Sequence, residues 1–551
     1  MAPAEPGATI VPRPGSMDRR TFLIRAARLA ALAAPGALAA ACDLLGLPVP
    51  APRPAIPVPP STPVASPAGL PASPAPRASG SRTAIGAENL RPGSRGWDVV
   101  RRPPRLEGYL DRASVGPGER LALQVRASGP FEVDWYRLGW YGGDGGRLVR
   151  ADRGVHPSTS ADAAVPSPDP LTGLVEPGWS TALELTVPAD WPSGMYLAIL
   201  GASSDRPAAV PFVVRPPASG TRTPAPVLFV SAALTWQAYN GWGGKSLYSY
   251  NSSGPVTASG TKAAATVSLA RPYEQDGGAG YLRRWEYQFV RWQEREAREV
   301  EYCADVDLEL HPEVLAGRRL VVFAGHHEYW SRPMREALQA AVDGGTNVLF
   351  LSANEIYWQV RLEAGPDGPA RRITCYKSAR RDPLTPTQPS LATCRWREQP
   401  VNEPEAALVG QMYGHVVRRP ADWIVVNSGH WLYEGTGLRD GDRLTNLVGQ
   451  EYDTYFPDLA PAGTVLLARS PVAAIGATPG EPGDLPSPPV QTATIYTAPS
   501  GATVFAAGTF QWSWALDDYG ERAYEGVPTP LDPRVGQVTR NLFDRLGDGP
   551  A

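Results

Sequence analysis

The feature that most constrains the fold is a series of continuous apolar runs beyond Thr223. These runs are 226–230, 319–324, 347–351, 491–496 and 503–507. The amphipathic segments expected to form helices are 282–300, 334–342 and 534–546. Strands without polar alternation are buried on both faces, and their alternation with helices predicts a parallel sheet covered by helices. We therefore expect an α/β domain over residues 223–551.

The segment before this domain has a different pattern of apolar and polar residues. Short runs of alternating apolar and polar residues are separated by turns of Gly, Pro and Asp, and no helical period appears. These runs are 121–126, 131–136, 182–187 and 195–200. Regularly spaced short strands of this kind are typical of two packed antiparallel sheets. We expect a β-sandwich domain over residues 98–216.

The N-terminal 42 residues resemble an export signal. Arg19 and Arg20 precede an apolar run at 29–41, the order found in twin-arginine signals. That run of 13 residues is too short to cross a bilayer as a helix. It ends in Ala39-Ala-Ala-Cys42, which resembles a lipobox; the alternative is cleavage after an A-x-A site and a soluble product. Met17 is an alternative start to Met1.

This signal predicts a destination and a cofactor. We expect export to the cell envelope, with a lipid on Cys42 anchoring the chain to the outer face of the cytoplasmic membrane. Twin-arginine export carries folded proteins, often because a cofactor is inserted in the cytoplasm, so it is the first indication of a metal. Residues 43–97 follow as a Pro/Ala-rich tether, and such a composition favours extended, unfolded chain.

The charge and the cysteine content exclude some classes of function. The net charge is −3 and no large basic block occurs, so nucleic-acid binding is excluded. Membrane contact is expected only through the lipid, and homo-oligomer formation stays open. The four cysteines include no C-x-x-C pair of the structural zinc type. Cys375 and Cys394 are close in sequence and destined for an oxidising compartment, which predicts a disulfide between them, with Cys303 as a buried thiol.

Candidate site residues follow the predicted strands, where ligands of open α/β sheets bind. They are Tyr239, Tyr248, His326, His327, Glu328 and Asn354, with His430 and Glu451 further along the chain. Burying a carboxylate such as Glu328 is costly without a cation or hydrogen-bond donors, which favours a metal ligand or a general base. Taken alone, the two tyrosines are more typical of core or surface aromatics, and Asn354 is equally typical of a residue that caps the following turn. No G-x-S-x-G, H-E-x-x-H, Walker or dinucleotide-binding motif follows a strand.

These segments together resemble the N,N-dimethylformamidase large-subunit family. The motifs that carry the resemblance are Trp135 to Gly146, Gln237-Ala-Tyr239-Asn240, His326-x-Glu328-Tyr-Trp330, Asn354-x-x-Tyr-Trp358 and Gly449-x-Glu451-x-Asp453. The similarity runs from about Leu106 to the C-terminus. It implies hydrolysis of a small amide to a carboxylic acid and an amine. We expect a flavodoxin- or glutamine-amidotransferase-like α/β domain and an immunoglobulin-like sandwich.

The resemblance also implies a mononuclear ferric site. By position, Tyr239, Tyr248 and Glu328 match the metal ligands. His326 matches a catalytic histidine, Asn354 a substrate-polarising amide, and Glu451 an acid/base carboxylate outside the ligand set. The chain departs from the family in having His327 where the dimethylformamidases have Pro, a shorter link between the tyrosines, and an export signal, so the natural substrate stays open.

Elementary chemistry agrees with such a site, and two alternatives remain. Phenolate and carboxylate oxygens are hard anionic donors that suit Fe(III), and three protein ligands leave positions for water and a carbonyl oxygen. One alternative is a non-catalytic envelope protein whose sandwich binds a polysaccharide or a protein. The other is a zinc hydrolase that uses His326 or His327.

Overall fold

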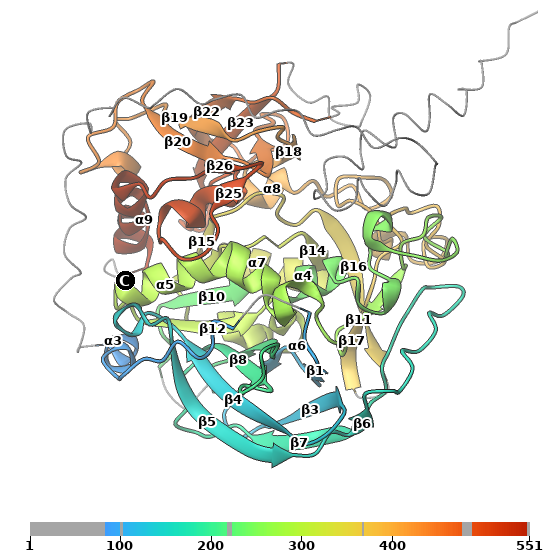
Figure 1. Ribbon diagram of the computed structural model, residues 1–551. Coiled ribbons are helices and arrows are strands. Elements are labelled where there is room, and N and C mark those ends of the chain that lie inside the picture. The colour runs from blue at the N-terminus through green and yellow to red at the C-terminus, as the bar shows by residue number, and fades with distance from the viewer. Residues whose placement is uncertain (1–82, 100–102, 218–222, 366–367, 476–487, 548–551) are drawn as a thin grey trace, which may run out of the picture. The chain divides into compact units, whose positions relative to one another are not determined.

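The computed structural model describes residues 83–99, 103–217, 223–365, 368–475 and 488–547 (Figure 1). The export signal, Cys42 and most of the expected tether lie outside these ranges. No helix in them is long and apolar enough to span a membrane. The expected tether 43–97 proves to be folded from Thr83 onward. Helix α3 (Ala84–Asn89) is capped by the Thr83 hydroxyl, and Ile85 and Trp97 are buried, because both pack into the core of the α/β domain.

Two sheets follow α3 and share one apolar core. One sheet contains β1 (Glu107–Leu110), β3 (Arg120–Ala127), β6 (Thr159–Ser160) and β7 (Thr181–Thr186). The other has the order β2 (Ser114–Val115), β9 (Ala208–Val214), β8 (Gly194–Leu200), β4 (Phe131–Leu138) and β5 (Gly146–Val155). Leu121 and Val125 of β3 pack with Trp135 and Phe212 of the second sheet. Most pairings are antiparallel, as the alternating runs predict.

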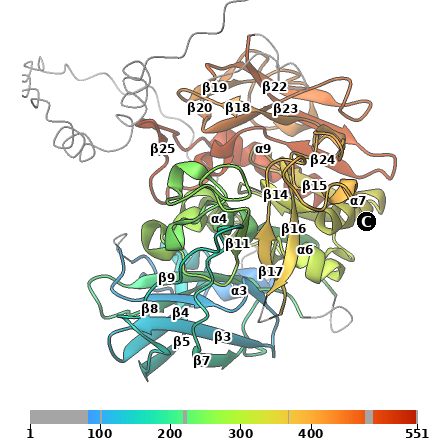
Figure 2. The same cartoon turned by 90° about the vertical axis from the view of Figure 1, so that its right-hand side faces the viewer.

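The α/β domain is organised by a seven-stranded mixed sheet. Its order is β12 (Val300–Ala304), β10 (Val227–Ser231), β13 (Leu320–Phe323), β15 (Asn347–Phe350), β24 (Thr503–Ala506), β23 (Val490–Thr497) and β22 (Val465–Pro471). The first five strands are parallel, as expected. At one edge β23 pairs antiparallel with β24, and β22 pairs antiparallel with β23 (Figure 2). Four of the five apolar runs form the parallel strands β10, β13, β15 and β24, whereas the run 491–496 lies in the antiparallel β23, and β12 lies outside the predicted runs.

The helices of this domain differ in detail from the expectation. They include α4 (Ala233–Tyr239), α5 (Tyr287–Arg295), α6 (Asp307–Leu310), α7 (Arg332–Asp343), α8 (Ala406–Val409) and α9 (Pro533–Leu546). The expected helix 282–300 begins as a π-helical turn, Leu282–Glu286, and continues as α5. It ends early because Ala297 adopts a left-handed conformation (φ 53°), and the chain then enters β12.

Smaller sheets surround this core. The sheet with the most strands has the order β11 (Thr266–Ser268), β17 (Gly368–Thr374), β16 (Trp358–Gly365) and β14 (Tyr329–Ser331) (Figure 2). The two-stranded sheets are β18 (Met412–Val416) with β21 (Glu451–Thr454), β19 (Ala421–Ile424) with β20 (Arg443–Val448), and β25 (Ala523–Tyr524) with β26 (Val527–Pro528).

The predicted disulfide between Cys375 and Cys394 is wrong. Both residues and Cys303 are buried free thiols. The Cys375 thiol donates toward the Gln359 carbonyl and the Cys394 thiol toward the Ala392 carbonyl, so the two sulfur atoms are directed to different acceptors. Burial raises the pKa of each thiol to about 12, which keeps both protonated at neutral pH.

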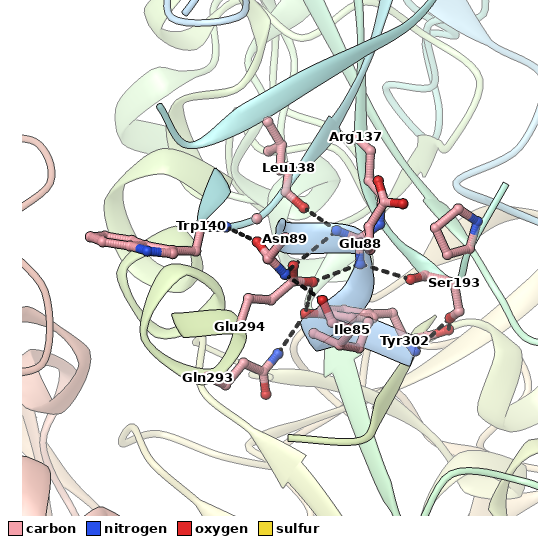
Figure 3. Close-up of polar contacts among 12 residues, drawn as sticks. Ile85, Glu88, Asn89, Arg137, Leu138, Trp140, Ser193, Gln293, Glu294 and Tyr302 are labelled. Atoms are coloured by element: carbon pink, nitrogen blue, oxygen red, sulfur yellow. Dashed lines mark hydrogen bonds and ion pairs between the residues drawn. The ribbon is translucent and has the colours of Figure 1, made fainter. Parts of the chain in front are cut away.

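The sandwich and the α/β domain are joined by a buried polar cluster (Figure 3). Arg137 of β4 donates to both carboxylate oxygens of Glu294 in α5, at 2.7 and 2.9 Å, and neither side chain is exposed. Tyr302 and Asn89 each donate a further 2.7 Å hydrogen bond to the same carboxylate. Strand β4 is buried on both faces, since Trp135 faces the sandwich core and Leu138 the α/β core. The two domains therefore share an interface of fixed geometry.

Candidate metal and active site

The carboxyl ends of three neighbouring parallel strands supply the site. Tyr239 ends α4, which follows β10, while Glu328 follows β13 and Asn354 follows β15. Helix α4 begins directly after its strand because the Asp305 carboxylate accepts the Leu234 N–H at 3.1 Å and so caps the first turn. The sheet topology thus gathers residues separated by more than a hundred positions.

The hydroxyls of Tyr239 and Tyr248 and both carboxylate oxygens of Glu328 form one cluster of four oxygens. The Tyr239 hydroxyl donates to Oε2 of Glu328 at 2.7 Å, and the Tyr248 hydroxyl donates to Oε1 at 2.5 Å. The two tyrosine oxygens are 2.9 Å apart, and their rings stack with centres 4.4 Å apart. Each tyrosine oxygen therefore lies within hydrogen-bond distance of the other tyrosine and of one carboxylate oxygen of Glu328.

The surroundings of this oxygen cluster oppose negative charge. Burial raises the pKa of Glu328 and raises the pKa values of Tyr239 and Tyr248 well above the ordinary value. One nearby cation acts in the other direction: Lys377 lowers the pKa of Glu328, and its Nζ lies 3.3 Å from the centre of the Tyr248 ring. The two hydroxyls are therefore neutral donors to Glu328, and deprotonation of all three groups would need a cation between them.

His326 lies beside the oxygen cluster. Its Nε2 is 3.7 Å from Oε2 of Glu328, and its ring centre is 4.1 Å from that of Phe510. Neither ring nitrogen has a hydrogen-bond partner among the described residues. Burial lowers the pKa of His326 to about 3, so the imidazole is neutral at physiological pH.

His327 points away from this cavity. It is fully buried, and its ring packs edge-on against Phe323 at 4.9 Å. No group of three His, Cys, Asp or Glu side chains suited to a metal occurs within the described ranges. The zinc alternative therefore has no ligand set in this part of the chain. His430 also lies elsewhere, where its Nδ1 accepts the Leu432 N–H at the start of a short helical turn.

Asn354 and Glu451 form a pair on the same cavity wall. Nδ2 of Asn354 donates to Oε2 of Glu451 at 2.8 Å, and the Asn354 backbone N–H donates to Asp453 at 2.8 Å. Burial raises the pKa of Glu451 well above its ordinary value. Asn354 (φ 58°) and Gln450 (φ 63°) both hold left-handed backbone conformations beside the cavity. Such strain persists where surrounding structure fixes it, commonly at functional sites.

These residues line a cavity of about 530 Å³. The polar part of its wall consists of Tyr239, Tyr248, His326, Glu328, Asn354 and Glu451, together with Gln275 and Gln450. The remaining lining is largely aromatic: Tyr250, Tyr281, Trp285, Tyr357, Trp358, Tyr413 and Phe510. Arg284 is the only lysine or arginine among the described residues of the lining. The cavity can therefore hold an organic molecule against the oxygen cluster.

The sequence predicted most residues of this site, but it did not predict Lys377 or the hydrogen bond from Trp358. Lys377 lies in a loop with no motif around it, and its Nζ is buried without a hydrogen-bond partner. The indole N–H of Trp358 donates to Oε1 of Glu328 at 3.0 Å, a role that its place in the Asn354-x-x-Tyr-Trp358 motif does not specify. Only the tertiary fold places either residue beside the cluster.

Comparison with known proteins identifies the family. A family described as N,N-dimethylformamidase beta subunit-like, C-terminal, matches residues 132–526, which include every residue of the cavity wall. No curated protein gives a significant match. Because the family match spans more than half of the 551 residues, the chain belongs to the N,N-dimethylformamidase beta subunit-like family.

Proposed function

We propose that the protein hydrolyses the C–N bond of an amide in this cavity, giving a carboxylic acid and an amine. The observation that carries the proposal is the convergence of the Tyr239, Tyr248 and Glu328 oxygens on one point of the cavity wall. Two phenolates and one carboxylate are hard donors that together balance the charge of Fe(III). We therefore assign these three residues as ligands of a single ferric ion, which when bound supplies Lewis acidity toward the amide carbonyl and water.

The other polar residues of the wall have separate roles in this proposal. His326 offers unpartnered ring nitrogens beside the cluster, so it accepts a proton from the attacking water and returns it to the leaving amine. Asn354 donates one N–H to Glu451, which orients its amide group, and its second N–H donates to the substrate carbonyl oxygen. Glu451 is assigned to proton exchange with the solvent side of the cavity.

The same proposal extends to the fold type and the cellular location. Numbered in chain order, the five parallel strands have the order 2-1-3-4-5, which supports a flavodoxin-like or glutamine-amidotransferase-like domain. The shared core of the two antiparallel sheets supports an immunoglobulin-like sandwich. We propose that the enzyme works in the cell envelope, a location supported by the Arg19-Arg20 signal pattern.

The decisive experiment combines metal analysis with turnover. Protein purified after native export should contain one iron per chain and a visible phenolate-to-iron absorption band. It should also release an amine from a simple neutral amide. Colourless protein that contains no iron and releases no amine would favour the non-catalytic envelope protein instead.

A further inference from the structure

We infer that the substrate amide carries a carboxylate at the far end of an apolar or aromatic spacer, and that Arg284 binds this carboxylate. The inference rests on the proposed function for the identity of the bond that is cleaved. It goes further by naming the class of substrate. Three observations support it: the size of the cavity, the π-helical turn that carries Arg284, and the charge distribution along the cavity wall.

The cavity is too large for a minimal amide. An amide of five non-hydrogen atoms would occupy about 150 Å³ if each atom took roughly the 30 Å³ of a water molecule. The cavity volume is about 530 Å³, within the range of roughly 300–1,000 Å³ that is typical of sites for larger organic ligands. Its aromatic lining predicts that the additional part of the ligand is apolar and flat.

The helix that carries Arg284 is built irregularly at this position. Residues Leu282–Glu286 form a π-helical turn, a rare feature that is concentrated at functional sites. Arg284 and Trp285 both line the cavity, whereas Glu286 points into the core, where it accepts from Ser231 and Trp236 at 2.8 Å. Gly325 allows this close packing, since a Cβ there would lie 2.8 Å from Cγ of Glu286. The core thus fixes the turn that presents Arg284.

The charge of Arg284 has no counterpart in the described protein. Its guanidinium lies over the rings of Trp285 (4.8 Å) and Trp514 (5.9 Å), and no carboxylate of the described residues pairs with it. A guanidinium held over aromatic rings without a carboxylate partner keeps N–H groups available for a bidentate carboxylate. Among the described residues that line the cavity, Arg284 is the only lysine or arginine, so it is the side chain there that can recognise an anionic ligand.

The acidic end of the cavity fixes the orientation of such a ligand. Three aromatic rings lie between Arg284 and Glu328. The ring centres of Trp285 and Phe510 are 5.2 Å apart and those of Phe510 and His326 4.1 Å apart, and Nε2 of His326 is 3.7 Å from Oε2 of Glu328. Arg284 attracts a ligand carboxylate, whereas Glu328 and Glu451 offer it no counter-charge. The amide therefore lies at the oxygen cluster, and a spacer is needed to reach the guanidinium.

Binding to iron-free protein tests this inference without turnover. The probes are para-(acetamidomethyl)benzoate and the neutral para-(acetamidomethyl)benzyl alcohol, which has the same spacer, and calorimetry gives each dissociation constant. We expect the carboxylate to bind about tenfold tighter than the alcohol, as a charge-assisted bidentate pair warrants. Arg284→Gln should remove this preference, and Arg284→Lys should retain part of it.

Arg545→Gln is the matched control. Its guanidinium also lies 4.8 Å from a tryptophan ring, that of Trp431, but outside the cavity, so the preference should be unchanged. Equal binding of both probes by the wild type, or a preference that survives in Arg284→Gln, would overturn the inference. Turnover of the neutral amide without a carboxylate preference would overturn it and leave the proposed function intact. Carboxylate-selective binding without hydrolysis of any amide would support the role of Arg284 and overturn the proposed function.

Discussion

The ammonium group of Lys377 lies 3.3 Å from the centre of the Tyr248 ring, while the hydroxyl of that ring donates to Glu328. Burial lowers the pKa of Lys377 to about 8, although the charge of Glu328 opposes this shift. The backbone of Lys377 is also left-handed, with φ 54°. A buried, strained and unpartnered ammonium costs stability, so its position against one proposed ligand suggests that it adjusts the electronic properties of that ligand.

Replacing Lys377 with Met should separate stability from function. The free energy of unfolding should stay equal or rise by about 1 kcal/mol, because a buried ammonium without a hydrogen-bond partner is removed. In the iron-loaded protein, the phenolate absorption band should move to longer wavelength, because a nearby positive charge no longer stabilises the phenolate electrons. Denaturant unfolding and visible spectra measure the two effects. An unchanged spectrum together with lower stability would make Lys377 a structural residue, and Lys377→Arg should give the smaller spectral shift.

Substitutions in and beside the oxygen cluster should have different effects on iron binding and on turnover. Tyr239→Phe and Tyr248→Phe should weaken the visible band, and Glu328→Ala should abolish iron binding, because each removes an assigned ligand oxygen. His326→Ala should keep the iron and lose turnover, since we assign this residue to proton transfer. Elemental analysis and amine release measure these outcomes.

Tyr281→Phe is the control for this series. Its ring lines the same cavity, 5.6 Å from that of Tyr239, but its oxygen lies outside the hydrogen-bonded cluster. It should retain both iron and colour. Loss of iron in this variant, or full iron content in Glu328→Ala, would contradict the ligand assignment.

The buried pair between Arg137 and Glu294 should dominate the stability of the domain interface. Glu294→Gln leaves the guanidinium buried without a counter-charge, which typically costs about 3–5 kcal/mol. Asp144→Asn removes a matched but exposed partner, that of Arg95, and should cost less than about 1 kcal/mol. Denaturant midpoints of the two variants provide the comparison, and equal losses would show that the buried pair has no special role.

Glu286 should make stability depend on pH. Burial raises the pKa of its carboxyl to about 7, and hydrogen bonds from Ser231 and Trp236 only partly offset this effect. An acid whose pKa is higher in the folded state binds more protons there, so stability falls as pH rises from the unfolded-state pKa, about 4.5, through 7. Between pH 5 and 8 the stability of wild type relative to Glu286→Gln should therefore fall by about 2–3 kcal/mol. A difference that is constant over this range would refute the assignment.

The N-terminal signal can be tested independently of the fold. Replacing Arg19 and Arg20 with Lys should leave the precursor inside the cell, because twin-arginine recognition requires the arginine pair. Cys42→Ser should release the exported protein from the membrane fraction by removing the expected lipid attachment. Cell fractionation and immunoblotting check both outcomes. Normal export of the double lysine variant would contradict the targeting prediction.

Local pattern determined those parts of the protein that depend on hydrophobic periodicity. The continuous apolar runs predicted the parallel strands β10, β13, β15 and β24, since a strand buried on both faces has no polar positions. The rule that ligands bind at the carboxyl ends of such strands selected Glu328 and Asn354. The helix end at Ala297 was missed, because a left-handed residue other than Gly, Asn or Asp carries little sequence signal.

Only the tertiary structure decided how distant residues meet. Cys375 and Cys394 are close in sequence, yet the fold directs their thiols to different carbonyls. Lys377 reaches Tyr248, Arg137 reaches Glu294, and Arg284 enters the cavity through a π-helical turn, and no periodicity marks any of these contacts. A strand that is buried on both faces consists of consecutive apolar residues, and such a run can be seen directly in the sequence. The distance between two side chains from separate elements depends on packing of the whole core, which local sequence does not contain.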